Sequence, residues 1–378
     1  MEGAIWQVSL CRQGFEEPLC AELRAWAGKG DPECSIPAPG VVVWRGPTQA
    51  DREAFLFERQ RLPDARWHPW EKGEPPLPAA TEAEHLHIFT HGEPPAALVR
   101  RVRRVRDVMA GPEAPPVHPP GANSAVTQVL VLAQGLWVAR HRAALLKCPY
   151  PGGEPGLRHG QDAPSRSALK LREAWLHLQR PPAPGERVVD LGAAPGGWSR
   201  ICLEQGCRVT AVDNGPMRIA GLEDLPGRLT HLRADGLRYR PPAGELPVDW
   251  LLADMLISPG VCLGLLKKWL GEGWARRLVV NIKLPQQNPL PALAPLRAWL
   301  AGQDGVQWKL RHLFHDRREL TLIATVQGRT PPPRAGATPR GAAAGKPPGR
   351  KGGPRSARPG AGAAPSPRRP GKKPRTRR

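Results

Sequence analysis

The sequence feature that most limits the possible fold is an apolar segment that runs directly into a glycine-rich loop. Val188-Val189-Asp190-Leu191 has the composition of a buried strand, and Gly192-Ala193-Ala194-Pro195-Gly196-Gly197-Trp198 continues it into a tight loop and the start of a helix. A strand that enters a helix through such a loop is typical of α/β folds, in which the loop approaches a ligand at the carboxyl edge of a parallel sheet.

The loop differs from the G-x-G-x-x-G pattern of dinucleotide-binding folds. From Asp190 to Gly197 it reads D-x-G-x-x-P-G-G, in which Pro195 stiffens the loop and Gly196 and Gly197 let a ligand approach the backbone. A helix N-terminus suits a carboxylate as readily as a phosphate. S-adenosylmethionine offers an amino-acid carboxylate and no phosphate, so the pattern favours it as the ligand.

Apolar runs and helices alternate around this loop, from residue 156 to residue 330. This alternation predicts one α/β domain with a parallel sheet and helices on its faces. The predicted strands are Arg187–Leu191, Arg208–Val212, Leu229–Arg233, Asp249–Ala253, Arg277–Ile282, Trp308–Phe314 and Glu319–Val326.

The first 155 residues predict two smaller α+β units. Residues 1–75 hold a strand at Ala4–Cys11, a helix through Leu19 and Trp26, and a strand at Val41–Trp44, and the stretch Glu71–Pro78 has the composition of a linker. The predicted elements of residues 76–155 are a strand at His85–Thr90, a helix at Ala96–Met109 and strands at Val126–Ala133 and Leu136–His141.

The helix at Ala96–Met109 combines an apolar seam with a broad basic face. Its arginines are Arg100, Arg101, Arg103, Arg104 and Arg106. Such a face can lie along RNA phosphates, and it can equally be an ordinary solvated helix surface.

The net charge of +21 is divided unevenly along the chain. Residues 331–378 hold 14 Lys and Arg and no acidic residue, so the other 330 residues carry 41 basic against 34 acidic side chains, or +7. The same 48 residues contain no Val, Ile, Leu, Met or aromatic side chain. They are expected to form a disordered basic tail that binds a polyanion.

Composition also limits the cellular setting. Seven cysteines without a C-x-x-C pair argue against a disulfide framework and a four-cysteine zinc site, and no metal is expected. The sequence shows neither a signal-peptide pattern nor an apolar run of the roughly 20 residues that a membrane span needs. We therefore expect a cytoplasmic protein with no membrane partner.

Aspartates follow three successive predicted strands. Asp213, 23 residues after Asp190, is spaced to accept hydrogen bonds from ribose hydroxyls, and Asp235 could accept from an adenine amine. Asp254 follows the fourth strand. One such aspartate alone would more often cap a turn, but three after this loop favour a nucleoside site.

One lysine stands in an unusual place, and a second, which taken alone would more often be a solvated helix lysine, accompanies it. Lys283 ends the apolar run Leu278-Val279-Val280-Asn281-Ile282, and Lys170 lies on a helix before the first strand of the α/β domain. Asp254 is followed neither by the Pro-Pro-Tyr of amino-group methylases nor directly by a cysteine nucleophile, since Cys262 comes eight residues later.

These segments resemble the RNA 2′-O-ribose methyltransferases whose active site is a Lys-Asp-Lys-Glu tetrad, and more narrowly the bacterial 23S rRNA cytidine 2′-O-methyltransferases with an N-terminal THUMP domain. The blocks that carry the resemblance are Cys11–Glu16, Asp162–Ser167, the glycine loop, Val212–Met217, Asn281–Pro285 and His315–Thr321. Gln286–Pro289 lacks the basic residues usual for the family, and the basic tail lies outside its pattern.

The resemblance implies a Rossmann-like class I methyltransferase domain with a mostly parallel sheet and an antiparallel last strand, preceded by a small α+β region. Residues 1–75 would be ferredoxin-like, 76–155 THUMP-like and RNA-binding, and 156–330 the methyltransferase. It implies a catalytic tetrad of Lys170, Asp254, Lys283 and Glu319, with Lys283 as proton acceptor. The implied contacts to S-adenosylmethionine are Ser167, Ala194, Pro195, Gly196, Gly197, Asp213, Asp235 and Asp254.

Two functions remain open at this level. The first is 2′-O-ribose methylation of a cytidine in 23S rRNA, either naked or in a precursor of the large ribosomal subunit. The second is a catalytically inactive rRNA-binding assembly factor that keeps the methylase fold as a scaffold. A complete tetrad favours the enzyme.

Overall fold

The structure is a computed structural model that describes residues 6–27, 32–46, 55–70, 85–110, 119–158 and 165–327. Residues 1–329 form one compact unit. The expected linker at Glu71–Pro78, the segment Asp162–Pro164 and the basic tail at 331–378 lie outside the described residues. Within those ranges, no helix combines the length and the apolar composition needed to cross a membrane.

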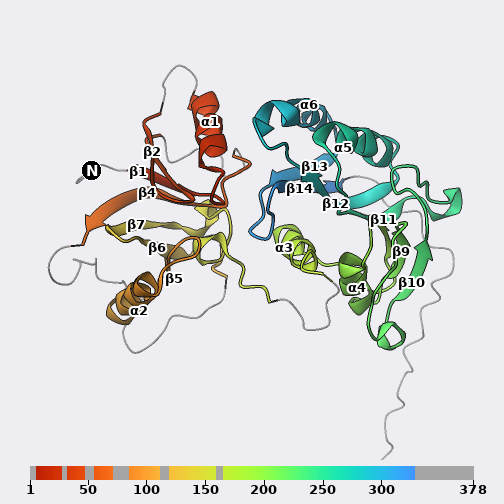
Figure 1. Cartoon of the computed structure of the whole chain (residues 1–378), viewed down its shortest axis with the longest axis horizontal. Coiled ribbons are helices and arrows are strands. Elements are labelled where there is room, and N and C mark those ends of the chain that lie inside the picture. The colour runs from red at the N-terminus through yellow and green to blue at the C-terminus, as the bar shows by residue number, and fades with distance from the viewer. Residues whose placement is uncertain are drawn as a thin grey trace, which may run out of the picture. The chain divides into compact units, whose positions relative to one another are not determined.

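The N-terminal part of the described chain forms one seven-stranded sheet in the order β2-β3-β1-β4-β7-β6-β5 (Figure 1). Its elements are β1 (Trp6–Leu10), α1 (Glu16–Ala27), β2 (Cys34–Ala38), β3 (Val41–Trp44), β4 (Gln60–Pro69), β5 (His85–Phe89), α2 (Ala96–Ala110), β6 (Ala125–Val131) and β7 (Gly135–Arg142). Strand β4 joins the two halves, because it pairs with β1 along one edge and with β7 along the other. The strands of regions 1–75 and 76–155 therefore share a sheet, and their division into two domains stays a prediction.

A second seven-stranded sheet among the described residues has the order β10-β9-β8-β11-β12-β14-β13. Its strands are β8 (Arg187–Leu191), β9 (Arg208–Val212), β10 (Arg228–Leu232), β11 (Val248–Ala253), β12 (Ala275–Lys283), β13 (Val306–Arg311) and β14 (Glu319–Val326). The five from β8 to β12 pair in parallel, and β14 pairs antiparallel with both β12 and β13. The expected Rossmann-like sheet with an antiparallel last strand is confirmed.

The chain order of this sheet reverses between β8 and β11. From β8 the chain moves outward to β9 and β10, and then returns to β11 on the other side of β8. In open α/β sheets, ligands bind beyond the carboxyl ends of the strands at such a reversal. The glycine loop after β8 and Asp254 after β11 both lie there.

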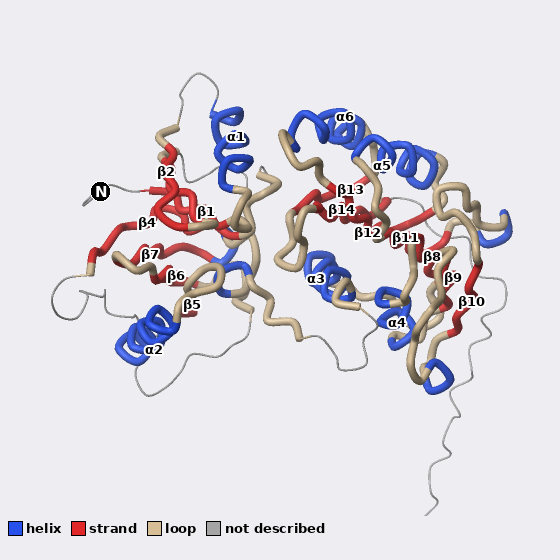
Figure 2. The backbone as a smooth tube through the Cα atoms, in the orientation of Figure 1, coloured by secondary structure: helices blue, strands red, loops and turns tan. Residues whose placement is uncertain are grey.

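Helices cover both faces of the second sheet, with α3 and α4 on one face and α5 and α6 on the other (Figure 2). They are α3 (Ala168–Leu178), α4 (Gly197–Glu204), α5 (Pro259–Leu266), extended by a π-helical turn at Lys267–Gly271, and α6 (Pro289–Ala301). Strand alternation explains this division, because successive side chains point to opposite faces. Val279 packs in the α3–α4 cluster, whereas its neighbours Leu278 and Val280 pack in the α5–α6 cluster.

Most predicted elements are present, with differences at the strands that lack a clear apolar pattern. β10 begins and ends one residue earlier than expected, so Asp235 lies in a turn three residues beyond the strand instead of ending it. β13 ends at Arg311, and Leu313 and Phe314 belong to the following turn. β2 and β4 were not predicted, because β4 buries the polar residues Gln60 and Arg61 and is interrupted by a bulge opposite Trp6 and Val8.

The N-terminal sheet generates a stability prediction at Trp137 of β7. This side chain is fully buried, and its ring lies 5.1 Å from that of Trp67. Trp137→Ala is expected to lower the free energy of unfolding by about 3–5 kcal/mol, because it removes a large side chain from a closed core. Val108→Ala, at an exposed position of α2, should change it by no more than about 0.5 kcal/mol. Urea unfolding of both variants measures the difference, and equal losses would contradict the packing described here.

Candidate active site

Strand pairing brings two of the four predicted catalytic residues side by side. Lys283 is the last residue of β12 and Glu319 the first of β14, and the antiparallel register pairs them directly. Lys170 comes from the first turn of α3, and Asp254 directly follows β11. Four separate elements therefore supply the four side chains.

Ion pairs join all four residues. Lys170 Nζ lies 2.5 Å from Glu319 Oε1 and 3.6 Å from Asp254 Oδ1. Lys283 Nζ donates a hydrogen bond of 3.0 Å to Glu319 Oε2. Glu319 thus uses one oxygen for each lysine, and Lys170 links it to Asp254.

Burial makes these contacts strong. Lys170 and Glu319 are buried, whereas the Lys283 side chain is 28% exposed. Burial alone would raise the pKa of Glu319, but the two lysines outweigh it and lower the pKa to about 2. Burial likewise opposes the charged form of Lys170, yet Asp254 and Glu319 raise its pKa above the ordinary value. Both groups are charged at neutral pH.

Asp254 is also held from β12. Asn281 Nδ2 donates to Asp254 Oδ1 at 2.8 Å, and Asn281 Oδ1 accepts from the Thr321 hydroxyl of β14 at 2.8 Å. Both residues lie inside the segments that resemble the family, but no role was predicted for either. A fully buried asparagine within the apolar run Leu278–Ile282 is the signal that could have identified it.

The glycine loop leaves no room for side chains beside this cluster. Gly192 and Gly196 have φ values of +74° and +114°, which favour glycine. A Cβ at Gly192 would lie 2.5 Å from Met255 Cγ, and one at Gly197 would lie 3.2 Å from Ser167 Oγ. The loop is therefore adjacent to the residue after Asp254 and to the start of α3, and its backbone can approach a ligand closely.

Asp213 closes this loop from the neighbouring strand. Its Oδ2 accepts from the Ala194 backbone N–H at 3.1 Å, and its Oδ1 accepts from that of Gly215 at 2.6 Å. Each carboxylate oxygen can accept a further hydrogen bond. The geometry is compatible with the expected contact to ribose hydroxyls.

The remaining predicted cofactor residues border the same loop. Asp235 is half-exposed and accepts from the Leu237 backbone N–H, and the adjacent Gly236 would bring a Cβ within 3.7 Å of the Gly192 nitrogen. The Ser167 carbonyl accepts from Trp198 Nε1 at 2.7 Å. These contacts join the start of α3 to α4, which follows the loop.

Asp190 was read only as part of the loop pattern and has a structural contact of its own. Burial raises its pKa to about 7, and Ser199 Oγ donates to its Oδ2 at 2.7 Å. It ties β8 to α4 beneath the loop.

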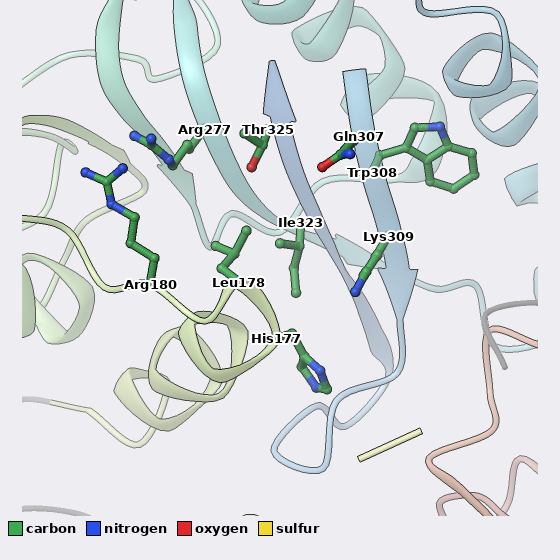
Figure 3. Close-up of a pocket in the computed structure, with 9 residues that line it drawn as sticks. All are labelled: His177, Leu178, Arg180, Arg277, Gln307, Trp308, Lys309, Ile323 and Thr325. Carbon is green, nitrogen blue, oxygen red and sulfur yellow. The ribbon is translucent and has the colours of Figure 1, made fainter. Parts of the chain in front are cut away.

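A separate hollow of about 630 Å³ lies at the other end of the sheet (Figure 3). Its lining includes Arg180, Arg277 and Lys309. Arg277 stands six residues before Lys283 on β12, or about 20 Å at roughly 3.3 Å per residue. Glu186 lies 2.6 Å from Arg180 and 3.7 Å from Arg277. The hollow is therefore distinct from the lysine–carboxylate cluster.

In the described part of the chain, no group of three or more His, Cys, Asp or Glu side chains is placed to hold a metal ion.

Comparison with known proteins matches the part of the chain that holds β8 to β11 to a family model, and most of the chain to a relative. Residues 163–265 match the family model "FtsJ-like methyltransferase". The "Ribosomal RNA large subunit methyltransferase M" of Azoarcus sp. (strain BH72) is 32% identical over 372 residues, which cover 85% of this chain and 96% of that protein.

Two further relatives carry the same name. Those of Alkalilimnicola ehrlichii and Halorhodospira halophila are 46% and 45% identical over 183 residues each. These matches cover 47% and 46% of this chain. The chain spans about half the length of these two relatives, 49% and 51%.

The glycine loop generates a prediction at Gly192, with Gly185 as its matched control. Both have φ near +75°, but a Cβ at Gly185 would meet nothing within 4 Å. Gly192→Ala should therefore cost about 1–3 kcal/mol more unfolding free energy than Gly185→Ala, because Met255 must move. Chemical denaturation measures the free energy of unfolding of both variants, and equal losses would contradict a close contact between position 192 and Met255.

Proposed function

Because the chain belongs to the family of the ribosomal RNA large subunit methyltransferase M, we propose that it methylates a ribose 2′-hydroxyl of a cytidine in 23S rRNA, with S-adenosylmethionine as methyl donor. The observation that carries this proposal is the cluster of Lys170, Asp254, Lys283 and Glu319 beside the glycine loop. It supplies both a proton acceptor and a ligand cradle at one edge of the sheet.

The cradle suits the cofactor for three reasons. The loop of Ala194, Pro195, Gly196 and Gly197 leads from the carboxyl end of β8 to the N-terminus of α4, where backbone N–H groups suit the cofactor carboxylate, and Ala194 and Pro195 are partly exposed. Asp213 has free acceptor capacity for ribose hydroxyls, and Asp235 lies beside the loop for the adenine amine. Ser167 and Asp254 border the side nearest the lysines.

A ribose hydroxyl needs a proton acceptor before its oxygen can attack a methyl carbon. When bound, S-adenosylmethionine supplies a methyl group on a positively charged sulfur. Lys283 Nζ, in its neutral form, takes the hydroxyl proton. Glu319 orients Lys283, and Lys170 fixes the relative positions of Glu319 and Asp254.

The substrate follows from the family and from the N-terminal region. We propose that residues 76–155 act as a THUMP-like RNA-binding domain and that residues 1–75 form a small ferredoxin-like domain. The proposed partner is 23S rRNA or a precursor of the large subunit in the cytoplasm. Exposed arginines on α2, such as Arg100 and Arg104, support RNA contact there.

The alternative, an inactive rRNA-binding assembly factor, would tolerate loss of the tetrad. All four residues are present and paired, which favours the enzyme. Mass mapping of ribose methyl groups on 23S rRNA from cells with and without the protein tests the proposal. An unchanged map would favour the assembly factor.

Replacing Lys283 by Met should abolish methyl transfer while S-adenosylmethionine affinity stays within about threefold, because Lys283 removes a proton and does not hold the cofactor. Single-turnover transfer to rRNA and calorimetric cofactor titration measure the two effects. Activity above a tenth of wild type would exclude Lys283 as the base.

Asp213→Ala should show the reverse pattern. Loss of hydrogen bonds to a charged acceptor is expected to weaken cofactor binding by about 1.5–3 kcal/mol. Transfer at saturating cofactor should fall much less. Asp224→Ala, at an exposed position of the 3-10 helix Leu222–Asp224, is a control that should leave the affinity unchanged. Unaltered affinity in Asp213→Ala would contradict the ribose contact.

A further inference from the structure

We infer that Asp316 is a neutral carboxylic acid that donates a hydrogen bond to Thr321 and, through Asn281, orients the Asp254 carboxylate. Asp316 is then a positioning residue for methyl transfer, acting through two other side chains. The inference rests on the proposed function for its consequence in catalysis, and on hydrogen-bond geometry and burial for its protonation.

The first step is the orientation of the Asn281 amide. Its Nδ2 lies 2.8 Å from Asp254 Oδ1, and its Oδ1 lies 2.8 Å from Thr321 Oγ1. The reversed amide would place an oxygen against the Asp254 carboxylate, where two acceptors would repel. Asn281 Oδ1 therefore faces Thr321 and needs a proton from it.

The Thr321 hydroxyl has too few protons to donate to both of its neighbours, Asn281 and Asp316. It has one proton, which Asn281 Oδ1 receives. Thr321 Oγ1 also lies 2.9 Å and 3.1 Å from the two oxygens of Asp316. A hydrogen bond across these distances requires a second proton, and Asp316 is the group that can supply it.

The third step concerns the surroundings of Asp316, which is completely buried. Burial raises its pKa well above the ordinary value; Lys170 opposes the rise, Glu173 adds to it, the Leu313 backbone N–H opposes it and Glu319 adds to it. Two arginines contact its backbone carbonyl rather than its carboxyl group, with Arg59 at 3.0 Å and Arg12 at 3.3 Å. The carboxyl group therefore has no direct cationic partner among the described side chains.

The chain of hydrogen bonds explains why Asp254 keeps one orientation. Without the proton of Asp316, Thr321 could turn its hydroxyl toward that carboxylate, and Asn281 would lose the partner that fixes its amide. Among the described side chains, Asp254 would then keep Lys170 alone, at 3.6 Å. Misplacing a residue of the reacting site by about 1 Å can cost on the order of 100-fold in rate.

The decisive test compares Asp316→Asn with Asp316→Leu in the full chain. Asparagine has the same shape as a neutral aspartic acid, and its amide can donate to Thr321 while its oxygen accepts from Leu313. Asp316→Asn should keep kcat within about threefold, whereas Asp316→Leu should lower kcat at least about tenfold with little change in KM for rRNA. Equal losses in both variants would overturn the inference, because an ionised Asp316 is not replaced by an amide.

Infrared spectroscopy at neutral pH gives a readout that needs no substrate. The wild-type minus Asp316→Asn difference spectrum should contain the carbonyl stretch of a protonated carboxyl group, and a carboxylate band instead would overturn the inference. The difference is needed because the pKa of Asp190 is also raised. If the carbonyl band is present and wild type transfers no methyl group to rRNA, the proposed function fails while the neutral Asp316 stands.

Thr321→Val and Thr321→Ser test the same path if Asp316→Leu fails to fold. Thr321→Ser keeps the hydroxyl and should keep kcat near the wild-type value. Thr321→Val has the same shape without the hydroxyl, and its kcat should fall as far as that of Asp316→Leu. Full activity in Thr321→Val would overturn the proposed path from Asp316 to Asp254.

Discussion

The pairing of Lys283 with Glu319 is the contact on which the rest of the site depends. It follows from backbone register, since β12 ends at the residue where its antiparallel partner β14 begins. Moving that register by one residue would send every side chain of β14 to the opposite face. Glu319 would then leave the lysines, and Thr321 would leave Asn281. The antiparallel last strand is therefore a requirement of the proposed chemistry as well as a feature of the fold.

The parallel part of the sheet has a complementary role. Because β8, β9 and β11 end at the same edge, the glycine loop, Asp213 and Asp254 gather there from distant parts of the sequence. Helix α3 adds Lys170 from before the first strand. The partners of Lys170 lie on β14 and directly after β11. Helix α3, the parallel strands and the antiparallel strand must therefore all be in place before the cluster is complete.

How much could be predicted from the sequence differs between these parts. The glycine loop, the strand-end aspartates and the lysine closing an apolar strand are local patterns, and they identified the methyltransferase sheet. The resemblance to a known family assigned the tetrad, and the structure brings those four residues together. The network of Asn281, Thr321 and Asp316 was not predicted, because its order depends on strand register and on which atoms are buried. β4 escaped detection for a similar reason, since its buried polar side chains find partners only in the folded sheet.

The two lysines of the site differ in a way that supports the roles proposed for them. Lys170 is buried, with two carboxylates within 3.6 Å, and removing its proton would leave Asp254 and Glu319 without a buried counter-charge. Lys283 is more exposed and, among the described carboxylates, pairs with Glu319 alone. When Lys283 loses its proton, Glu319 still has Lys170 at 2.5 Å, so the carboxylate remains paired. Glu319 therefore keeps a paired cation when Lys283 acts as the base, and Lys283 is the more exposed of the two lysines, where a ribose can reach it.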